Sequence, residues 1–181
     1  MGSGDDLNAC FPFKCGVQGE KTGIRQVAFF LSTFTNKVDK KGRLSVPAPF
    51  RAAVSSSHFP GIVLYRPLNL PCIEGADISF LEQLSDRLYG DFGPFDPHQM
   101  SVATSILGGA AQLSFDPEGR VMLPNELREF AGIENQATFV GIGRKFQIWD
   151  SEAYKGHHAK QLAIAEVTAP NLPAFGGGEK S

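Results

Sequence analysis

A segment of nineteen residues occurs twice in this chain, 77 positions apart, and no other feature constrains the possible folds as strongly. Residues 36–54 read NKVDKKGRLSVPAPFRAAV, and residues 113–131 read LSFDPEGRVMLPNELREFA. Aligned without a gap, the two copies keep their apolar positions in phase and share five identical pairs: Asp39 and Asp116, Gly42 and Gly119, Arg43 and Arg120, Pro47 and Pro124, and Arg51 and Arg128. Such a duplication predicts two similar units within one chain.

Each copy has the local pattern of a tight turn between two strands, followed by a helix. Leu44 and Val46 alternate with Ser45, which is the period of a half-buried strand, and Pro47 suits the first turn of a helix. In the shared pattern D-x-x-G-R, the aspartate can accept hydrogen bonds from the N–H groups of the turn, and the glycine supplies a positive φ. We therefore expect the residues that hold the two turns to be Asp39, Gly42, Asp116 and Gly119.

The two copies differ in charge although they share a pattern. The first copy sets Lys37, Lys40, Lys41, Arg43 and Arg51 against Asp39 alone. The second sets Arg120 and Arg128 against Asp116, Glu118 and Glu126. The whole chain has a net charge of −2, so it is not a general binder of polyanions, and any contact with nucleic acid requires a local basic patch.

The basic side chains of the first copy are the candidate binding residues. An arginine can pair with a neighbouring carboxylate or reach a phosphate or a guanine edge, so for Arg43 both roles stay open. No feature of the fold demands lysine at Lys40 and Lys41, because the second copy has Pro117 and Glu118 there. Contact with phosphate is the favoured interpretation of these lysines over ordinary solvated charge.

The rest of the pattern predicts an α+β fold that is mainly β. We expect strands at residues 28–35, 62–65, 72–73, 137–142 and 145–149, and helices beginning near residues 77, 97 and 150. In the second helix Met100, Ala103, Ile106 and Leu107 are expected to face inward, and Trp149 is expected in the core. Residues 1–28 are expected to be a disordered extension, either an appended segment or the result of an early start with Val27 as the true initiator. Residues 90–97 are expected to form a linker, and residues 169–181 a flexible tail.

Several classes of function find little support in the sequence. No apolar run approaches the roughly 20 residues of a membrane helix, so we expect no membrane partner. Cys10, Cys15 and Cys72 form no C-x-x-C pair, and His157 and His158 are expected to be an exposed pair. Common catalytic and nucleotide-binding motifs are absent from the sequence. We therefore expect no metal, no cofactor and no enzymatic activity.

The duplicated D-x-x-G-R-x-x-x-P, together with FLSTF at 30–34, FVGIG at 139–143 and FQIW at 146–149, closely resembles the MraZ family of bacterial transcriptional regulators. The resemblance runs from about Phe29 to Val167. It implies two AbrB-like β half-barrels, residues 29–90 and residues 94–168 with a linker helix, that form a pseudo-two-fold double-repeat barrel with short helices.

The resemblance also implies a function. A homo-oligomeric ring would bind double-stranded DNA at short repeats upstream of its own operon of division and cell-wall genes, in the cytoplasm and associated with the nucleoid. The DNA-binding residues would be Lys37, Lys40, Lys41, Arg43, Arg51 and Arg120, with Glu118 departing from the family pattern. One loop neutralises few phosphates, and a ring would present it several times. The competing hypothesis is an oligomeric scaffold without specific DNA binding. RNA binding is disfavoured because the sequence lacks the aromatic pattern of a single-strand reader.

Overall fold

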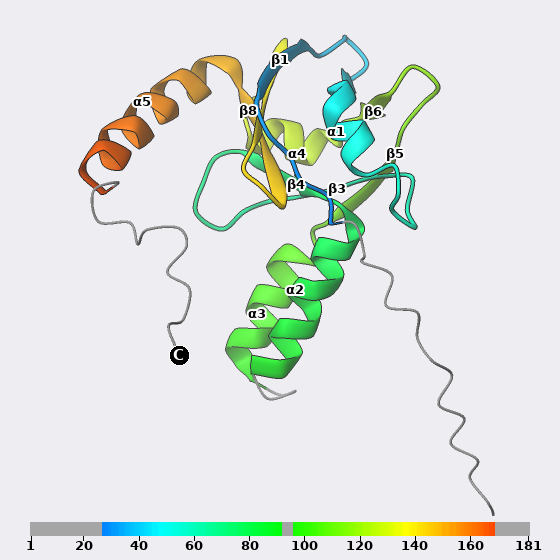
Figure 1. Cartoon of the computed structure of the whole chain (residues 1–181), viewed down its shortest axis with the longest axis vertical. Helices are drawn as coiled ribbons and strands as arrows, with labels where there is room; N and C mark the ends of the chain where they lie inside the picture. Colours follow the sequence, from blue (N-terminus) through cyan, green and yellow to red (C-terminus); the bar gives the residue numbers. More distant parts are fainter. Residues whose placement is uncertain (1–26, 92–95, 169–181) are drawn as a thin grey trace, which may run out of the picture.

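The computed structural model describes residues 27–91 and 96–168 (Figure 1). Nearly all of the expected N-terminal extension, the middle of the expected linker and the expected tail lie outside the described residues. The elements, in chain order, are β1 (Thr33–Lys37), β2 (Arg43–Ser45), α1 (Ala48–Ala53), β3 (Gly61–Tyr65), β4 (Ile73–Ala76), α2 (Ile78–Asp91), α3 (Pro97–Ile106), β5 (Ala111–Ser114), β6 (Arg120–Met122), α4 (Asn125–Phe130), β7 (Gln136–Gly141), β8 (Lys145–Asp150) and α5 (Ser151–Thr168). These elements confirm the expected α+β class.

Six of the strands form one antiparallel sheet in the order β1-β7-β8-β4-β3-β5. Each half of the chain lends a strand to the other half, because β1 pairs with β7 and β5 pairs with β3. The hairpins β3–β4 and β7–β8 meet through β4 and β8 at the centre of the sheet. In this order β1, β7 and β8 are equivalent to β5, β3 and β4 of the other half. The sheet therefore has the same succession of equivalent strands when it is followed from either edge.

The remaining strands, β2 and β6, pair with each other and link the two copies of the duplicated segment. Leu44 lies opposite Val121, its equivalent in the second copy. The flanking contacts are reciprocal, because Val46 N donates to Gly119 O at 3.1 Å and Leu123 N donates to Gly42 O at 3.0 Å. The turn of each half is thus hydrogen-bonded to the strand that leaves the turn of the other half.

The main core lies between the sheet and the two short helices α1 and α4. Phe50 of α1 is its centre, with ring centroids 5.2 Å from Phe30, 5.2 Å from Phe146 and 5.9 Å from Phe139. All four rings are buried. The aromatic side chains come from both halves, so the core belongs to the whole chain.

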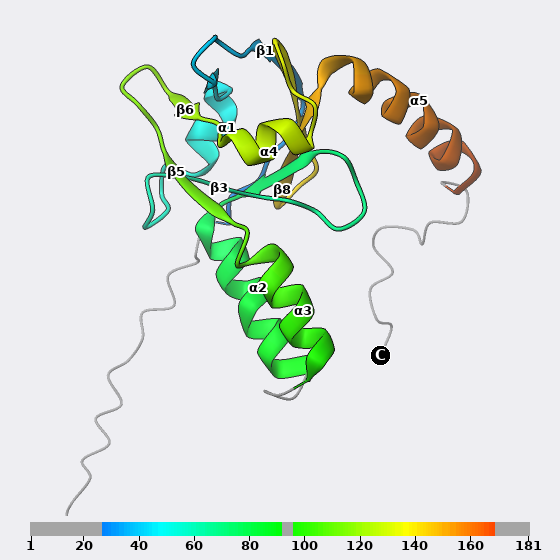
Figure 2. The same cartoon turned by 180° about the vertical axis from the view of Figure 1, so that it is seen from behind.

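The other face of the sheet carries a smaller apolar cluster of Val63, Tyr65, Ala76 and Leu81. Here α2 and α3 lie side by side and project away from the sheet, and α5 projects in another direction (Figures 1 and 2). The helices α2, α3 and α5 have 14, 10 and 18 residues and begin close to the expected positions near residues 77, 97 and 150. None of the helices formed by the described residues is long and apolar enough to span a membrane.

Three local predictions are wrong. The first strand begins at Thr33 rather than near residue 28, because Ser32 has a φ of 73° and separates β1 from the Phe30–Gly143 bridge. Met100 is exposed, while its neighbour Gln99 is buried, because only a narrow stripe of α3 faces the rest of the molecule. His157 is not a fully exposed partner of His158, because its ring stacks on the buried Trp149.

Candidate nucleic-acid interface

The turn between β1 and β2, residues 37–43, is called the basic turn here. Asp39 anchors it, with Oδ1 accepting from Lys41 N at 2.8 Å and Arg43 N at 2.9 Å. Arg43 Nε donates to Asp39 Oδ2 at 2.5 Å, so the guanidinium has a fixed orientation. Gly42 has a φ of 80°, a conformation that glycine adopts without strain. The sequence pattern D-x-x-G-R thus corresponds to a self-contained hydrogen-bonded turn.

The turn between β5 and β6, residues 114–120, is called the acidic turn here, and its backbone repeats this geometry. Asp116 Oδ1 accepts from Glu118 N at 3.0 Å and from Arg120 N at 2.9 Å. Arg120 Nε donates to Asp116 Oδ2 at 2.8 Å, and a second nitrogen of its guanidinium forms an ion pair with Glu118. Gly119 again has a positive φ, of 75°. Arg120 is therefore held by two carboxylates, whereas Arg43 is held by one.

The two anchoring carboxylates are ionised at neutral pH. Backbone N–H donation from Arg43 lowers the pKa of Asp39, and donation from Arg120 lowers the pKa of Asp116 in the same way. The nearby Arg43 guanidinium also contributes to the lowered pKa of Asp116. The pairing of β2 with β6 and the reciprocal hydrogen bonds of Gly42 and Gly119 place the two turns next to each other.

Electrostatics separates the two turns more than geometry does. Lys37, Lys40 and Lys41 are all exposed, and none of them forms an ion pair with a described residue. With Arg43, the basic turn carries four positive side chains and one carboxylate, and the acidic turn carries one positive side chain and two carboxylates. Only the basic turn therefore offers unpaired cations to a polyanion.

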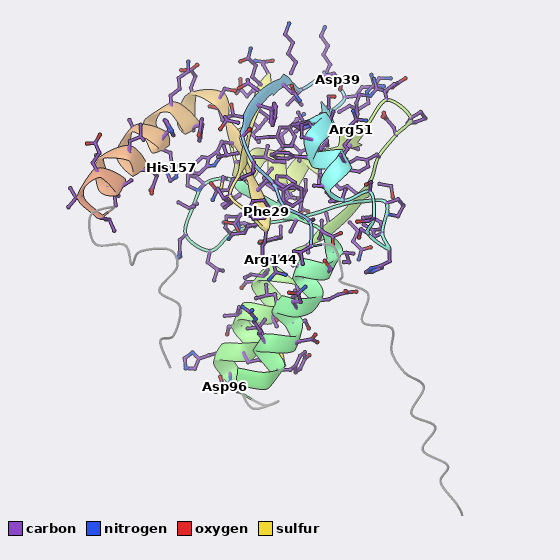
Figure 3. The ribbon with its side chains drawn as sticks, in the orientation of Figure 1. Phe29, Asp39, Arg51, Asp96, Arg144 and His157 are labelled. Carbon is purple, nitrogen blue, oxygen red and sulfur yellow. The ribbon has the colours of Figure 1, made fainter. Side chains whose placement is uncertain are left out.

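Arg51 lies in a different environment from the other candidates. It belongs to α1, and its guanidinium lies so close to Gly119 of the acidic turn that an added Cβ there would overlap it. Its Nε is buried and has no hydrogen-bond partner among the described residues. Figure 3 shows Asp39 and Arg51 at the same end of the molecule, far from Asp96 at the tip of the α2–α3 hairpin. Arg51 therefore lies near both turns, and its guanidinium packs against the acidic turn.

Arg128 is a neighbour of the basic turn that the sequence analysis did not place there. It is the equivalent of Arg51, and its Nη1 lies 3.6 Å from the position that a Cβ on Gly42 would take. With Asp39 and Lys40 it lines a surface cavity of about 460 Å³ beside the turn. Arg128 aligns with Arg51 in the duplicated segment, and this match was the sequence signal that could have placed Arg128 beside the turn.

Within residues 27–91 and 96–168, no group of three His, Cys, Asp or Glu side chains is arranged to hold a metal ion. Fold and site together define a class of protein: a duplicated α+β chain that presents one basic and one acidic turn from a shared two-stranded ribbon.

Comparison with known proteins identifies this class. The family model for the MraZ protein, described as antitoxin-like, matches residues 106–171. The protein named transcriptional regulator MraZ from Rickettsia canadensis is 44% identical over 136 residues, which cover 75% of this chain and 91% of that protein. The protein of the same name from Parvibaculum lavamentivorans is 44% identical over 147 residues, which cover 81% of this chain and 86% of that protein. The chain belongs to the MraZ family, whose curated members carry the name transcriptional regulator.

Proposed function

We propose that this regulator binds double-stranded DNA sequence-specifically through its basic turn. The observation that carries the proposal is the contrast between two turns of the same backbone geometry, of which one keeps three exposed lysines without ion pairs. Turn formation alone does not require these lysines, because the acidic turn forms without them. Phosphate contacts by lysine supply affinity that depends on salt concentration.

Within the basic turn we assign different roles to lysine and arginine. Lys37, Lys40 and Lys41 contact phosphates, because they are flexible and exposed. Arg43 reads a base edge, because Asp39 engages its Nε and thereby directs the rest of a planar, bidentate donor outward. Arg120 and Arg51 contribute less, since Arg120 is paired twice and Arg51 packs on Gly119.

The proposal extends to the assembly and the target. The two halves, residues 29–90 and 94–168, form AbrB-like half-barrels of one double barrel, and the reciprocal contacts between β2 and β6 support this arrangement. Several chains form a ring, which presents the basic turn repeatedly and gains affinity through effective concentration on spaced sites. The target is the DNA upstream of the chain's own operon of division and cell-wall genes, in the nucleoid. The proposal assigns no catalysis to the chain.

The test is a fluorescence-anisotropy titration with the duplex upstream of the protein's own gene, with a scrambled duplex, at two salt concentrations. Arg43→Ala is expected to reduce discrimination between the duplexes by about 1–3 kcal/mol. Lys41→Ala is expected to weaken binding to both duplexes alike and to lower the salt slope by about one. Arg87→Ala, an exposed site on α2, is the matched control and should change neither.

Equal and weak binding of the unmodified protein to both duplexes would contradict the proposal. In that case the basic turn would be ordinary charged surface, and the scaffold hypothesis would explain the family fold better. Native mass spectrometry of the unmodified protein tests the ring separately, because a monomer would contradict the assembly without contradicting DNA binding.

A further inference from the structure

A second cavity, of about 320 Å³, lies on the face of the sheet that α2 and α3 cover. Most of its wall is apolar and comes from three parts of the chain. Phe80 and Leu84 belong to α2, Ile106 belongs to α3, and the segment between β3 and β4 adds Pro67, Leu68 and Leu70. The volume is in the range of sites that take one small organic molecule.

One end of this cavity is polar and comes from three neighbouring strands. Glu74 Oε2 accepts from Tyr65 Oη at 3.0 Å and from Lys145 Nζ at 2.7 Å, and Gln147 Nε2 lies 3.4 Å from Glu74 Oε1. The Glu74 side chain is 8% exposed and that of Lys145 is 35% exposed. The carboxylate is therefore enclosed and neutralised, while the ammonium group is open to the cavity and keeps donors to spare.

The ion pair of Glu74 and Lys145 is weak evidence for a purely stabilising role. Replacing a buried ion pair by apolar side chains of similar volume is often neutral or stabilising. The surrounding cluster of Val63, Ala76 and Leu81 could accommodate such a replacement. The Tyr65 hydroxyl is committed to Glu74 as a donor, and burial raises the pKa of this hydroxyl further above its ordinary value. A fixed polar end in an otherwise apolar cavity is the arrangement that orients a ligand.

We propose that this cavity binds an amphipathic monocarboxylate, with its carboxylate at Lys145 Nζ and its apolar body against Phe80, Leu84 and Ile106. A cationic head group would meet the ammonium of Lys145 and is disfavoured. A neutral hydroxyl could accept one hydrogen bond but would gain no ion pairing. The expected order of affinity for equal chain length is thus carboxylate, then alcohol, then amine.

The experiment is isothermal titration calorimetry of the full chain with decanoate, decanol and decylamine, each below its aggregation concentration. Decanoate is expected to bind once per chain and at least about tenfold more tightly than decylamine. Leu84→Trp fills the cavity and should weaken decanoate at least about tenfold. Leu162→Trp, the same substitution on the exposed surface of α5, is the matched control and should leave the affinity unchanged.

Lys145→Gln tests the polar end separately and is expected to abolish the preference of decanoate over decanol. The Lys145→Gln variant leaves Glu74 without its cation, so its circular dichroism is compared with that of the unmodified chain. If the Lys145→Gln variant unfolds, the Leu84→Trp variant still tests the proposal. Absence of decanoate binding, equal binding by the Leu84→Trp variant, or equal affinity for decylamine would each overturn the proposal. Sedimentation velocity adds another such outcome: a smaller assembly in the Leu84→Trp variant would show that a second copy of the chain covers this cavity.

Discussion

Gly141 shows at the scale of one residue how closely the two halves approach. A Cβ at this position would overlap the backbone of Phe30 and Leu31, and Gly141 N donates to Ser32 O at 2.9 Å. Because backbone cannot move aside as a flexible side chain can, Gly141→Ala is expected to lower the free energy of unfolding by roughly 1–3 kcal/mol, the usual cost of overpacking. Urea denaturation measures this loss.

Gly156 in α5 is the matched control for that substitution, because nothing lies within 4 Å of a Cβ added there. Gly156→Ala is expected to raise the free energy of unfolding by about 0.5–1 kcal/mol, since alanine favours a helix interior over glycine. If Gly141→Ala and Gly156→Ala changed the free energy of unfolding alike, the backbone of Phe30 and Leu31 would have to move aside at little cost.

The anchoring carboxylates predict how stability depends on pH. The folded-state pKa values of Asp39 and Asp116 lie below the ordinary 3.8, so the unfolded chain binds more protons in acid. Their contribution to stability is therefore present above about pH 3.8 and is lost as the pH falls through the folded pKa. A double variant, Asp39→Asn with Asp116→Asn, should lose less stability than the unmodified chain between about pH 5 and 3. Urea midpoints over this range check it, and parallel curves would contradict the assignment.

Glu118 predicts a gain of function under the proposed mode of DNA binding. It occupies the place that Lys41 holds in the first copy, and it forms an ion pair with Arg120. Glu118→Lys adds a cation and leaves Arg120 paired with Asp116 alone, so DNA affinity should rise and its salt dependence should steepen. Glu166→Lys on α5 makes the same change of net charge away from both turns. If both variants tightened binding equally in anisotropy titrations, net charge alone would explain the effect.

At the scale of elements, α5 is the least anchored helix in the described part of the chain. It has 18 residues, none of them buried, and its closest ring contact is the His157 ring stacked on Trp149 with centroids 4.3 Å apart. His157→Ala should therefore speed amide hydrogen exchange in α5 while leaving β7 and β8 protected, because local opening follows local contacts. Lys160→Ala, an exposed substitution on the same helix, is the control. Unchanged exchange in the His157 variant would show that the stack does not hold the helix.

Element types could be predicted from the sequence because local periodicity encodes them. The helix after Asp77, the hairpin of β7 and β8, and the turn before Arg43 all follow from patterns within a few residues. The strand partners between the two halves could not be predicted, because the alternation in β1 indicates a buried face without indicating that β7 covers its edge.

The site divides in the same way. Hydrogen bonding by Asp39 could be predicted from a pattern of five residues, and the structure contains it. The packing of Arg51 on Gly119 and of Arg128 near Gly42 could not, because both contacts depend on the exchange of strands between halves. The polar end formed by Tyr65, Glu74 and Lys145 could not be predicted either, because Lys145 meets Glu74 only through the pairing of β4 with β8.

At the scale of the whole molecule, the exchange of strands makes each half incomplete. Residues 27–91 alone would lack β7 as the partner of β1 and β5 as the partner of β3. This segment is therefore expected either to remain unfolded or to pair with a second copy of itself in the exchanged arrangement. Circular dichroism and sedimentation at two concentrations distinguish these states. A cooperatively folded monomer of this half would contradict the expectation.

The pairing of Leu44 with Val121 places two turns of unequal charge about one approximate axis. In a dimer of identical chains, each mutation of the turn appears in both copies. In a chain that contains both copies, each turn can change in sequence independently of the other. A two-fold dimer matches a palindromic site, because the symmetry of the DNA mirrors that of the protein. A subunit with one basic and one acidic turn is asymmetric, so it would bind the duplex in one defined direction. Under the proposed mode of binding, the sites that suit such a subunit are direct repeats, all read in the same orientation.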